Sequence, residues 1–394
     1  MKYDFETLVD RKEQGSLKWN LMRTTNPDIP DGIVPFSVAD MELKNPPQII
    51  EGLKKCLDEV ILGYTGPTDK FLDIVTDWIS RRYGWKAEKE WLVFTPGVVT
   101  AFFHGVRSFT KPGDGIILMT PVYYPFYKAV EKGGRELVKC PLILENNYYT
   151  IDFELLEELA KKPENTMLIF CNPHNPVGRV WTAEEIQKVA DICQRNDVFL
   201  ISDEIHCDLI MPGHQFHSAA LAMEKMEHCM FCYAPSKTFN LAGMQTSCIV
   251  VPDEKERELF NLSRQEVSQS GPGILGLKAC EIAYSECDDW LNELLVVLNE
   301  NRLALEAFIQ ERLPEIQIIP LEGTYLQWLD LRAYGFTKEK LEEVMTKEAL
   351  LFLDEGYLFG DEGIGFERVN LACPKWVLME ALERLAAALE KYRK

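Results

Sequence analysis

The sequence predicts an α/β fold, with a large domain built on a mostly parallel sheet and a smaller α+β domain after it. Five apolar runs have the length of buried strands, at residues 115–119, 166–170, 198–202, 230–233 and 247–251. Helix-like segments alternate with several of these runs, which is typical of parallel sheets covered by helices. After about residue 270 the alternation stops, so we expect a change of architecture there.

The helical segments are predicted from apolar residues at helical spacing. In the first part of the chain they cover residues 98–109, 152–162 and 182–195, and Thr182 and Glu185 have the spacing of a capping box. In the second part, residues 275–312 predict a long helix that breaks near 287–289. Short strands at 316–320, 324–331 and 366–372 and helices at 338–349 and 375–392 complete it. The predicted division is residues 1–45, 46–285 and 286–394, the first segment joining the small domain.

Charge and composition exclude several classes of partner. A net charge of −20 over 394 residues argues against nucleic acid and anionic membranes. No apolar run approaches the roughly 18 residues that a membrane span needs, and the acidic start is not a secretory signal, so we expect a cytoplasmic protein. The 11 cysteines are predicted to be buried thiols. Cys229-x-x-Cys232 lacks a second ligand pair, so no metal site is predicted.

A lysine follows the strand-like run at 230–233, in the stretch APSKTFNLAG at residues 234–243. A lysine at such a place is usually a surface residue of a turn, because its charge is costly to bury. The alternative is that Lys237 is an amine nucleophile in a pocket, where it forms a Schiff base with a carbonyl cofactor. The residues at the ends of the other predicted strands bear on this choice.

Amide and carboxylate side chains follow two of those strands. Asn172 and Asn175 lie among prolines after strand 166–170, which predicts either an ordinary rigid turn or a fixed amide aimed at a ligand. Asp203 comes directly after the apolar strand 198–202. It either caps a turn or is a partly buried carboxylate that needs a cationic partner, such as a protonated ring nitrogen.

Two further positions suit a flat, phosphorylated ligand. Gly97 precedes the predicted helix 98–109, and the free backbone N–H groups at such a helix start could bind a phosphate. Tyr123 follows strand 115–119 and could lie against a ring, although tyrosines are more often core or interface residues.

Each of these signals is ambiguous alone, but together they match one cofactor. Pyridoxal 5′-phosphate (PLP) needs a lysine for its aldehyde, a carboxylate for its ring nitrogen and a phosphate site. It also benefits from a hydrogen-bond donor to its phenolic oxygen and an aromatic side chain on its face. The chain offers all five in order, so Lys237 is predicted to be catalytic.

The sequence resembles the fold-type I PLP-dependent enzymes of the aspartate aminotransferase superfamily over nearly its whole length. Within that group it is most similar to cystathionine β-lyases (C–S lyases) of the MalY/PatB type. The stretches that carry the resemblance include VDRKEQGSLKWN, FSVADMELKNPP, CNPHNPVGRVW, SDEIHCDL and SKTFNLAG. The resemblance implies a large domain with a mostly parallel, seven-stranded type of sheet flanked by helices, and a homodimer with shared active sites.

The resemblance also implies roles for particular residues. Catalytic roles fall to Lys237, Asp203 and Tyr123, and substrate binding to Arg368, Ala39 and Asn175. The implied cofactor contacts are Gly97, Val98, Val99, Tyr123, Asn175, Asp203, His206, Ser236 and Lys237, with Tyr64 reaching the phosphate bound by the partner subunit.

The chain departs from many aminotransferases at Ala234 and Gln245, where they place a serine and an arginine against the phosphate. His206 either orients Asp203 or the ring, or is a packed core residue. The implied reaction is α,β-elimination from L-cystathionine or a related cysteine thioether. Transamination is the main alternative, and a regulatory binding protein on the same fold is the other class.

Overall fold

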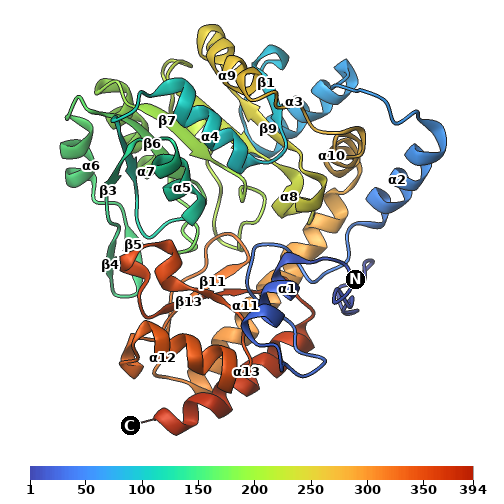
Figure 1. The fold of residues 1–394 in the computed structure, drawn as a ribbon, viewed down its shortest axis with the longest axis vertical. Coiled ribbons are helices and arrows are strands. Elements are labelled where there is room, and N and C mark those ends of the chain that lie inside the picture. The colour runs from blue at the N-terminus through green and yellow to red at the C-terminus, as the bar shows by residue number, and fades with distance from the viewer. Residues whose placement is uncertain (394) are drawn as a thin grey trace.

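Seven strands form the large sheet in the computed structural model, which describes residues 1–393 (Figure 1). Their order across the sheet is β1-β9-β8-β7-β6-β2-β3, and β9 alone runs against the other six. The mostly parallel sheet of seven strands is therefore confirmed. The strands are β1 (Leu92–Thr95), β2 (Gly115–Leu118), β3 (Glu136–Lys139), β6 (Asn165–Cys171), β7 (Phe199–Asp203), β8 (Cys229–Tyr233) and β9 (Ser247–Val250).

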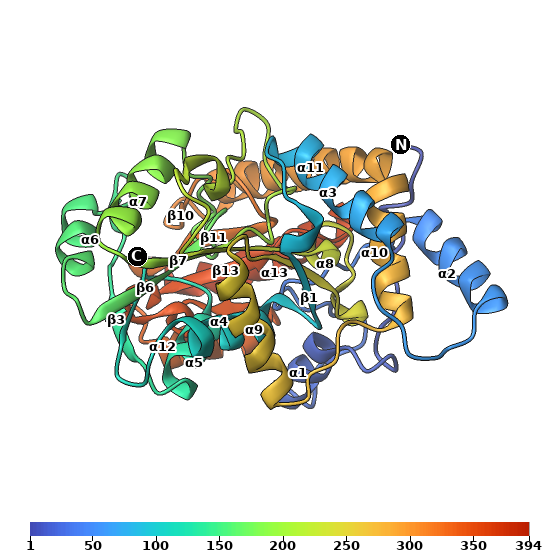
Figure 2. The same cartoon turned by 90° about the horizontal axis from the view of Figure 1, so that it is seen from above.

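Helices cover both faces of this sheet (Figure 2). Because side chains alternate along a strand, Ile116 and Leu118 of β2 pack in one apolar cluster and Ile117 in the other. The first cluster includes α4 (Val98–Phe109), α5 (Tyr124–Lys132) and α9 (Glu254–Glu266), and the second includes α6 (Phe153–Ala160) and α7 (Ala183–Arg195). Burial on both faces explains why the central strands are apolar throughout.

The helix ends follow the local sequence signals. The capping box of α7 is present, with the Thr182 side chain and the Glu185 side chain each bonded to the other's backbone N–H. The predicted long helix breaks at Cys287, between α10 (Ile274–Glu286) and α11 (Asp288–Arg312). The remaining helices of the large-sheet region are α2 (Pro47–Glu59), α3 (Asp69–Tyr83) and the single turn α8 (Pro235–Thr238).

A second, antiparallel sheet lies in the C-terminal part of the chain, in the lower half of Figure 1. Its order is β10 (Gln317–Ile318), β11 (Leu326–Asp330), β13 (Phe366–Asn370) and β12 (Asp354–Glu355). Helices α11 and α13 (Lys375–Leu389) pack together, and α12 (Lys338–Glu343) is extended by a π-helical turn at Val344–Glu348. The N-terminal segment, which includes α1 (Leu17–Thr25), bonds to this region where Phe36 N–H donates to Phe352 and Glu42 N–H donates to Ala372.

Some elements were not predicted. Strands β1 and β3 are short, and β3 is largely half-buried, so neither has an apolar run of strand length. The hairpin of β4 (Ile143–Glu145) and β5 (Tyr148–Thr150) is also short. The division at residues 45 and 285 stays a prediction. No helix within residues 1–393 is long and apolar enough to cross a membrane.

Candidate active site

A cavity of about 250 Å³ lies at the ends of the large-sheet strands and is lined by ten of the predicted site residues. Parallel β6 and β7 end at Cys171 and Asp203, and α8 follows β8 directly. Ligands bind at this edge of open α/β sheets because the strand ends and the following turns converge there. The ten residues are Ala39, Gly97, Val98, Val99, Tyr123, Asn175, Asp203, His206, Ser236 and Lys237.

The Lys237 amine lies inside this cavity and not at the surface. Its Nζ donates to the Ala39 carbonyl oxygen at 2.7 Å. Burial, and then the nearby Arg368 charge, lower the pKa of Lys237 to about 8. A substantial fraction of the amine is therefore neutral near pH 7 to 8, as a proton-accepting group requires.

Asp203 ends the central strand β7, between Cys171 of β6 and Cys232 of β8. Burial raises the pKa of its carboxyl group to about 7, and Lys237 opposes this shift. Its carboxylate accepts a hydrogen bond from Ile205 N–H at 3.3 Å. A carboxyl group this deeply buried gains most from a cationic hydrogen-bond donor, and a protonated ring nitrogen is one.

Asn175 joins the cavity to Arg368. The Arg368 Nη1 group donates to Asn175 Oδ1 at 2.8 Å, while Nη2 donates to Asp354. The Asn175 backbone N–H donates to Cys171 Sγ at 3.4 Å, which fixes the turn after β6. Within residues 1–393 the Asn175 side-chain NH₂ has no partner, so it is available to a ligand oxygen.

Gly97 and the start of α4 form the predicted phosphate site. Gly97 has φ +123°, a backbone conformation that favours glycine, and a Cβ added there would meet no atom within 4 Å. The first-turn N–H groups of α4 need external acceptors. Ser236, Gln245 and Thr246 also line the cavity. Gln245 and Thr246 are thus polar groups near the phosphate site in a chain that lacks the usual arginine.

A neutral histidine lines the same cavity. Burial and the Lys237 and Arg368 charges lower the pKa of His206 well below its usual value. Its ring contacts Tyr325 edge to face, and its buried Nδ1 has no partner among the described residues. A buried polar atom without a partner is costly, so a ligand that bonds to it would remove this cost.

These observations fit PLP. The cavity combines an amine of lowered pKa, a buried carboxyl group, a free amide donor, an unpaired imidazole nitrogen and open space beside helix N–H groups. The amine, the carboxyl group, the amide donor and the helix N–H groups have counterparts in the aldehyde, ring nitrogen, phenolic oxygen and phosphate of the cofactor, and the imidazole nitrogen is one further polar group beside them.

Tyr64 is the predicted contact that lies apart from the cavity. It is fully exposed, in the segment between α2 and α3 that projects from the molecule (Figures 1 and 2). Its neighbours Ile61 and Leu62 are 92% and 64% exposed.

Sequence reasoning missed the residues that hold the Ala39 segment, residues 36–43. Tyr325 donates to the Ala39 oxygen at 2.9 Å. Asn370 donates to the carbonyl oxygens of Val38 and Asp40, and Asp354 accepts from the Val38 N–H. The stretch EGTYLQWLD, which contains Tyr325, is among those that carry the resemblance, but no role was assigned to Tyr325 or Asp354, although both side chains bond to the backbone beside Lys237.

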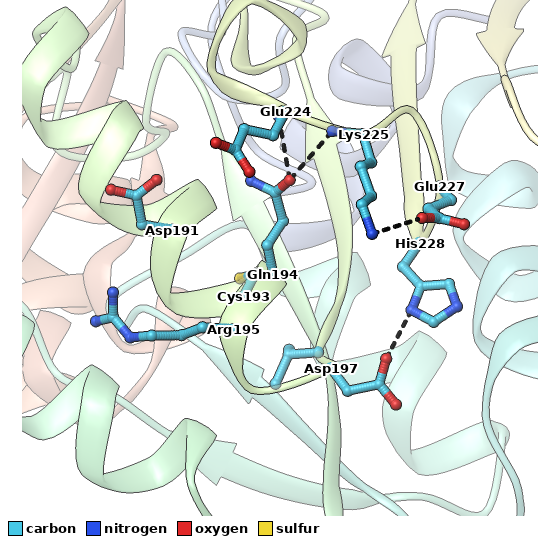
Figure 3. Close-up of a pocket in the computed structure, with 10 residues that line it drawn as sticks. Asp191, Cys193, Gln194, Arg195, Asp197, Glu224, Lys225, Glu227 and His228 are labelled. Carbon is cyan, nitrogen blue, oxygen red and sulfur yellow. Dashed lines mark hydrogen bonds and ion pairs between the residues drawn. The ribbon is translucent and has the colours of Figure 1, made fainter.

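A second cavity, of about 510 Å³, opens at the surface near the C-terminal end of α7 and the start of β8 (Figure 3). Two pairs of its lining side chains interact: Lys225 with Glu227 at 3.7 Å and His228 with Asp197 at 2.9 Å. No predicted site residue lines it. No group of three or more potential metal ligands occurs in the described part of the chain, here or elsewhere.

A family model for aminotransferase class I and II matches residues 31–385. The chain belongs to the aminotransferase class I and II family. Cystathionine β-lyase PatB of Bacillus subtilis (strain 168) is 40% identical over 98% of this chain and 100% of its own length. Protein MalY of Escherichia coli (strain K12) is 29% identical over 99% and 100%.

Solved structures in this family match the whole fold. Cystalysin from Treponema denticola, whose crystal structure contains PLP, superposes with a TM-score of 0.98, is 49% identical, and both chains are covered completely. The PLP-bound C–S lyase from Staphylococcus hominis gives a TM-score of 0.91 with 30% identity, over 99% of this chain and 98% of its own. The predicted resemblance to the family and its α/β fold are confirmed.

Proposed function

We propose that this protein is a PLP-dependent carbon–sulfur β-lyase. It acts on L-cystathionine or related cysteine thioethers, and with one water molecule it releases a thiol, pyruvate and ammonium. The observation that carries the proposal is that Lys237, Asp203 and Asn175 line one cavity and that Arg368 is hydrogen-bonded to Asn175 at its wall. The names and bound cofactors of the related C–S lyases support it.

Each residue has one task in this reaction. PLP, when bound, supplies an aldehyde for the substrate amine and a ring that accepts electrons from Cα. Arg368 binds the substrate carboxylate, because a guanidinium matches it bidentately. Lys237 Nζ removes the Cα proton, and in the substrate-free protein a hydrogen bond to the Ala39 oxygen holds it in the cavity.

The remaining side chains hold the cofactor. Asp203 keeps a proton on the ring nitrogen, and the Asn175 NH₂ donates to the phenolic oxygen. Tyr123 would pack on the ring, and His206 would bond to the cofactor through its Nδ1, which has no partner among residues 1–393. Gly97, Val98, Val99 and Ser236 bind the phosphate.

The direct test incubates purified protein with L-cystathionine and follows pyruvate and free thiol together. Equal amounts of the two products would support β-elimination. A parallel reaction with a 2-oxo acid acceptor measures transamination, which uses the same residues. Faster amino transfer than pyruvate release would make the protein an aminotransferase.

Replacing Arg368 with lysine should raise KM for amino acid substrates about tenfold or more, with a smaller change in kcat. Lysine keeps the charge but cannot donate from a planar fork to Asn175, Asp354 and the substrate together. Steady-state kinetics measure this, with Arg332→Lys as the control, because Arg332 follows β11 of the same sheet and also donates to an aspartate. An unchanged KM would mean that the carboxylate binds elsewhere.

We also propose a cytoplasmic homodimer in which a second copy covers the exposed segment 57–64. Leu57, Ile61, Leu62 and Tyr64 are each at least half exposed, and several exposed apolar side chains in one short segment suit a protein interface. The eleven cysteines are buried and free, which fits a reducing compartment. In the dimer, Tyr64 contacts the phosphate bound by the partner.

Mixing two impaired variants should restore activity if Tyr64 serves the partner's site. A dimer of one Tyr64→Ala and one Lys237→Ala subunit has one site with both defects and one site with neither. We expect about half the native activity per mixed dimer, measured after subunit exchange and separation by affinity tags. Absence of recovery in verified mixed dimers would show that Tyr64 acts in its own chain.

A further inference from the structure

One carboxylate oxygen of Asp354 connects Arg368 to the backbone segment that contacts Lys237. Asp354 Oδ2 accepts from Arg368 Nη2 and, at 2.8 Å, from the Val38 backbone N–H. Asp354 and Arg368 are directly opposite each other on β12 and β13, and both are buried. The arginine proposed to take the substrate carboxylate is therefore already bonded to a carboxylate of the protein, while its buried Nε has no partner among residues 1–393.

The second bond of Asp354 fixes a strained piece of backbone. Val38 has φ +57°, which is unfavourable for a β-branched residue and persists only where neighbours hold it. The Asp354 carboxylate accepts a hydrogen bond from the Val38 N–H, and the Asn370 side chain donates one to the Val38 carbonyl oxygen, each at 2.8 Å. The next carbonyl along the chain, that of Ala39, accepts from Lys237 Nζ. Three hydrogen bonds and one peptide unit thus connect Arg368 to the Lys237 amine.

The charges of Arg368 and Asp354 also affect the pKa of Lys237. Lys237 is surrounded by one cation and three acids, together with the neutral His206: Arg368 on β13, Asp354 on β12, Asp40 in the N-terminal segment and Asp203 on β7. Arg368 lowers the pKa of Lys237, and Asp354 acts in the opposite direction. A carboxylate bound to Arg368 therefore offsets the effect of the arginine's charge on the pKa of Lys237.

We propose that Asp354 is a positioning residue that takes the place of the substrate carboxylate at Arg368 and couples carboxylate binding there to the orientation and proton affinity of Lys237. The inference rests on the proposed function, because it assigns the substrate carboxylate to Arg368. When a substrate carboxylate binds, it accepts hydrogen bonds from the Arg368 guanidinium beside Asp354 or in its place. The hydrogen bond between Asp354 and the Val38 N–H then weakens, and the Val38–Ala39 backbone is less firmly fixed. Lys237 is then released from the Ala39 oxygen where it must meet Cα.

The test measures the protonation midpoint of Lys237 in the full-length protein freed of cofactor. The rate at which fluorodinitrobenzene labels Lys237 is followed against pH by peptide mass spectrometry. Asp354→Asn keeps an acceptor oxygen but removes the charge, so the midpoint should fall by about half a unit to one unit. Sodium acetate should raise it back towards the native value by binding Arg368, whereas sodium chloride at equal ionic strength should not.

Asp330→Asn is the matched control. Asp330 lies on β11 of the same sheet and is also a buried acid paired with an arginine, Arg332. It is not among the charges that act on Lys237. The substitution should leave the midpoint unchanged with and without acetate. In the native protein acetate must compete with Asp354, so its effect should be smaller than in Asp354→Asn.

An unchanged midpoint in Asp354→Asn, or a lowered midpoint that acetate does not restore, would overturn the proposal. Circular dichroism verifies folding, and Asp354→Ser serves as a second uncharged variant. Failure of both to fold while Asp330→Asn folds would assign Asp354 to stability alone and equally contradict it. The labelling uses no substrate, so a failure of lyase activity is seen separately from a failure of the coupling.

Discussion

Replacing Lys237 with alanine should abolish the covalent link to PLP and lower lyase turnover by on the order of 10²–10⁴-fold, the usual contribution of a proton-transferring side chain. Lys237 Nζ is the one amine in the cavity that the structure describes, and its pKa of about 8 suits proton transfer near neutral pH. The native protein should be yellow and should keep its cofactor after borohydride reduction. The alanine variant should release PLP after the same treatment.

Peptide mass spectrometry after reduction gives the direct measurement. A borohydride-stable adduct should map to the peptide that contains Lys237 in the native protein and be absent in the variant. Lys44→Ala, in which a half-exposed lysine paired with Asp4 is removed, is a suitable control. Retention of a reducible adduct by Lys237→Ala would mean that another lysine holds the cofactor.

Replacing Asp203 with asparagine should lower kcat by roughly 10²-fold while PLP occupancy changes much less. Asparagine cannot stabilise a proton on the ring nitrogen by charge, and the phosphate and Lys237 contacts are independent of it. Occupancy is measured by absorbance and kcat by pyruvate release. A loss of PLP as large as the loss of kcat would indicate that Asp203 mainly retains the cofactor.

Asp203→Asn, which should lower kcat, should raise the stability of the cofactor-free protein at high pH. Burial raises the folded-state pKa of Asp203 from 3.8 to about 7. The stability that depends on a protonated carboxyl group is thus complete below pH 4 and is lost as pH rises towards 7. Asp203→Asn avoids this loss, so above pH 7 it should be more stable than the native apoprotein by up to a few kcal/mol. Thermal unfolding at pH 5 and pH 8 measures the difference, which should grow with pH.

The agreement between predicted and observed structure is best where local signals are strong. Helix 98–109 matches α4, and the Thr182–Glu185 capping box begins α7 at Ala183. The central strands lie within one residue of their predicted limits because burial on both faces requires continuous apolar runs. Strand β3 was missed because it lies at the edge of the sheet and is only partly buried.

Some residues of the candidate site could also be predicted from local sequence signals, and others could not. The sequence alone places Lys237, Asp203 and Asn175 at the ends of predicted buried strands and Gly97 before a predicted helix, and a parallel sheet brings such strand ends together. The contacts of Asp354, Tyr325 and Asn370 with the Ala39 segment depend on the tertiary structure, because these residues come from β12, the residue before β11, and β13, and they bond to backbone some 300 positions away. Hydrogen bonds between distant residues leave no periodic pattern in a single sequence. They exist only when the small sheet and the N-terminal segment pack against the ends of the large sheet.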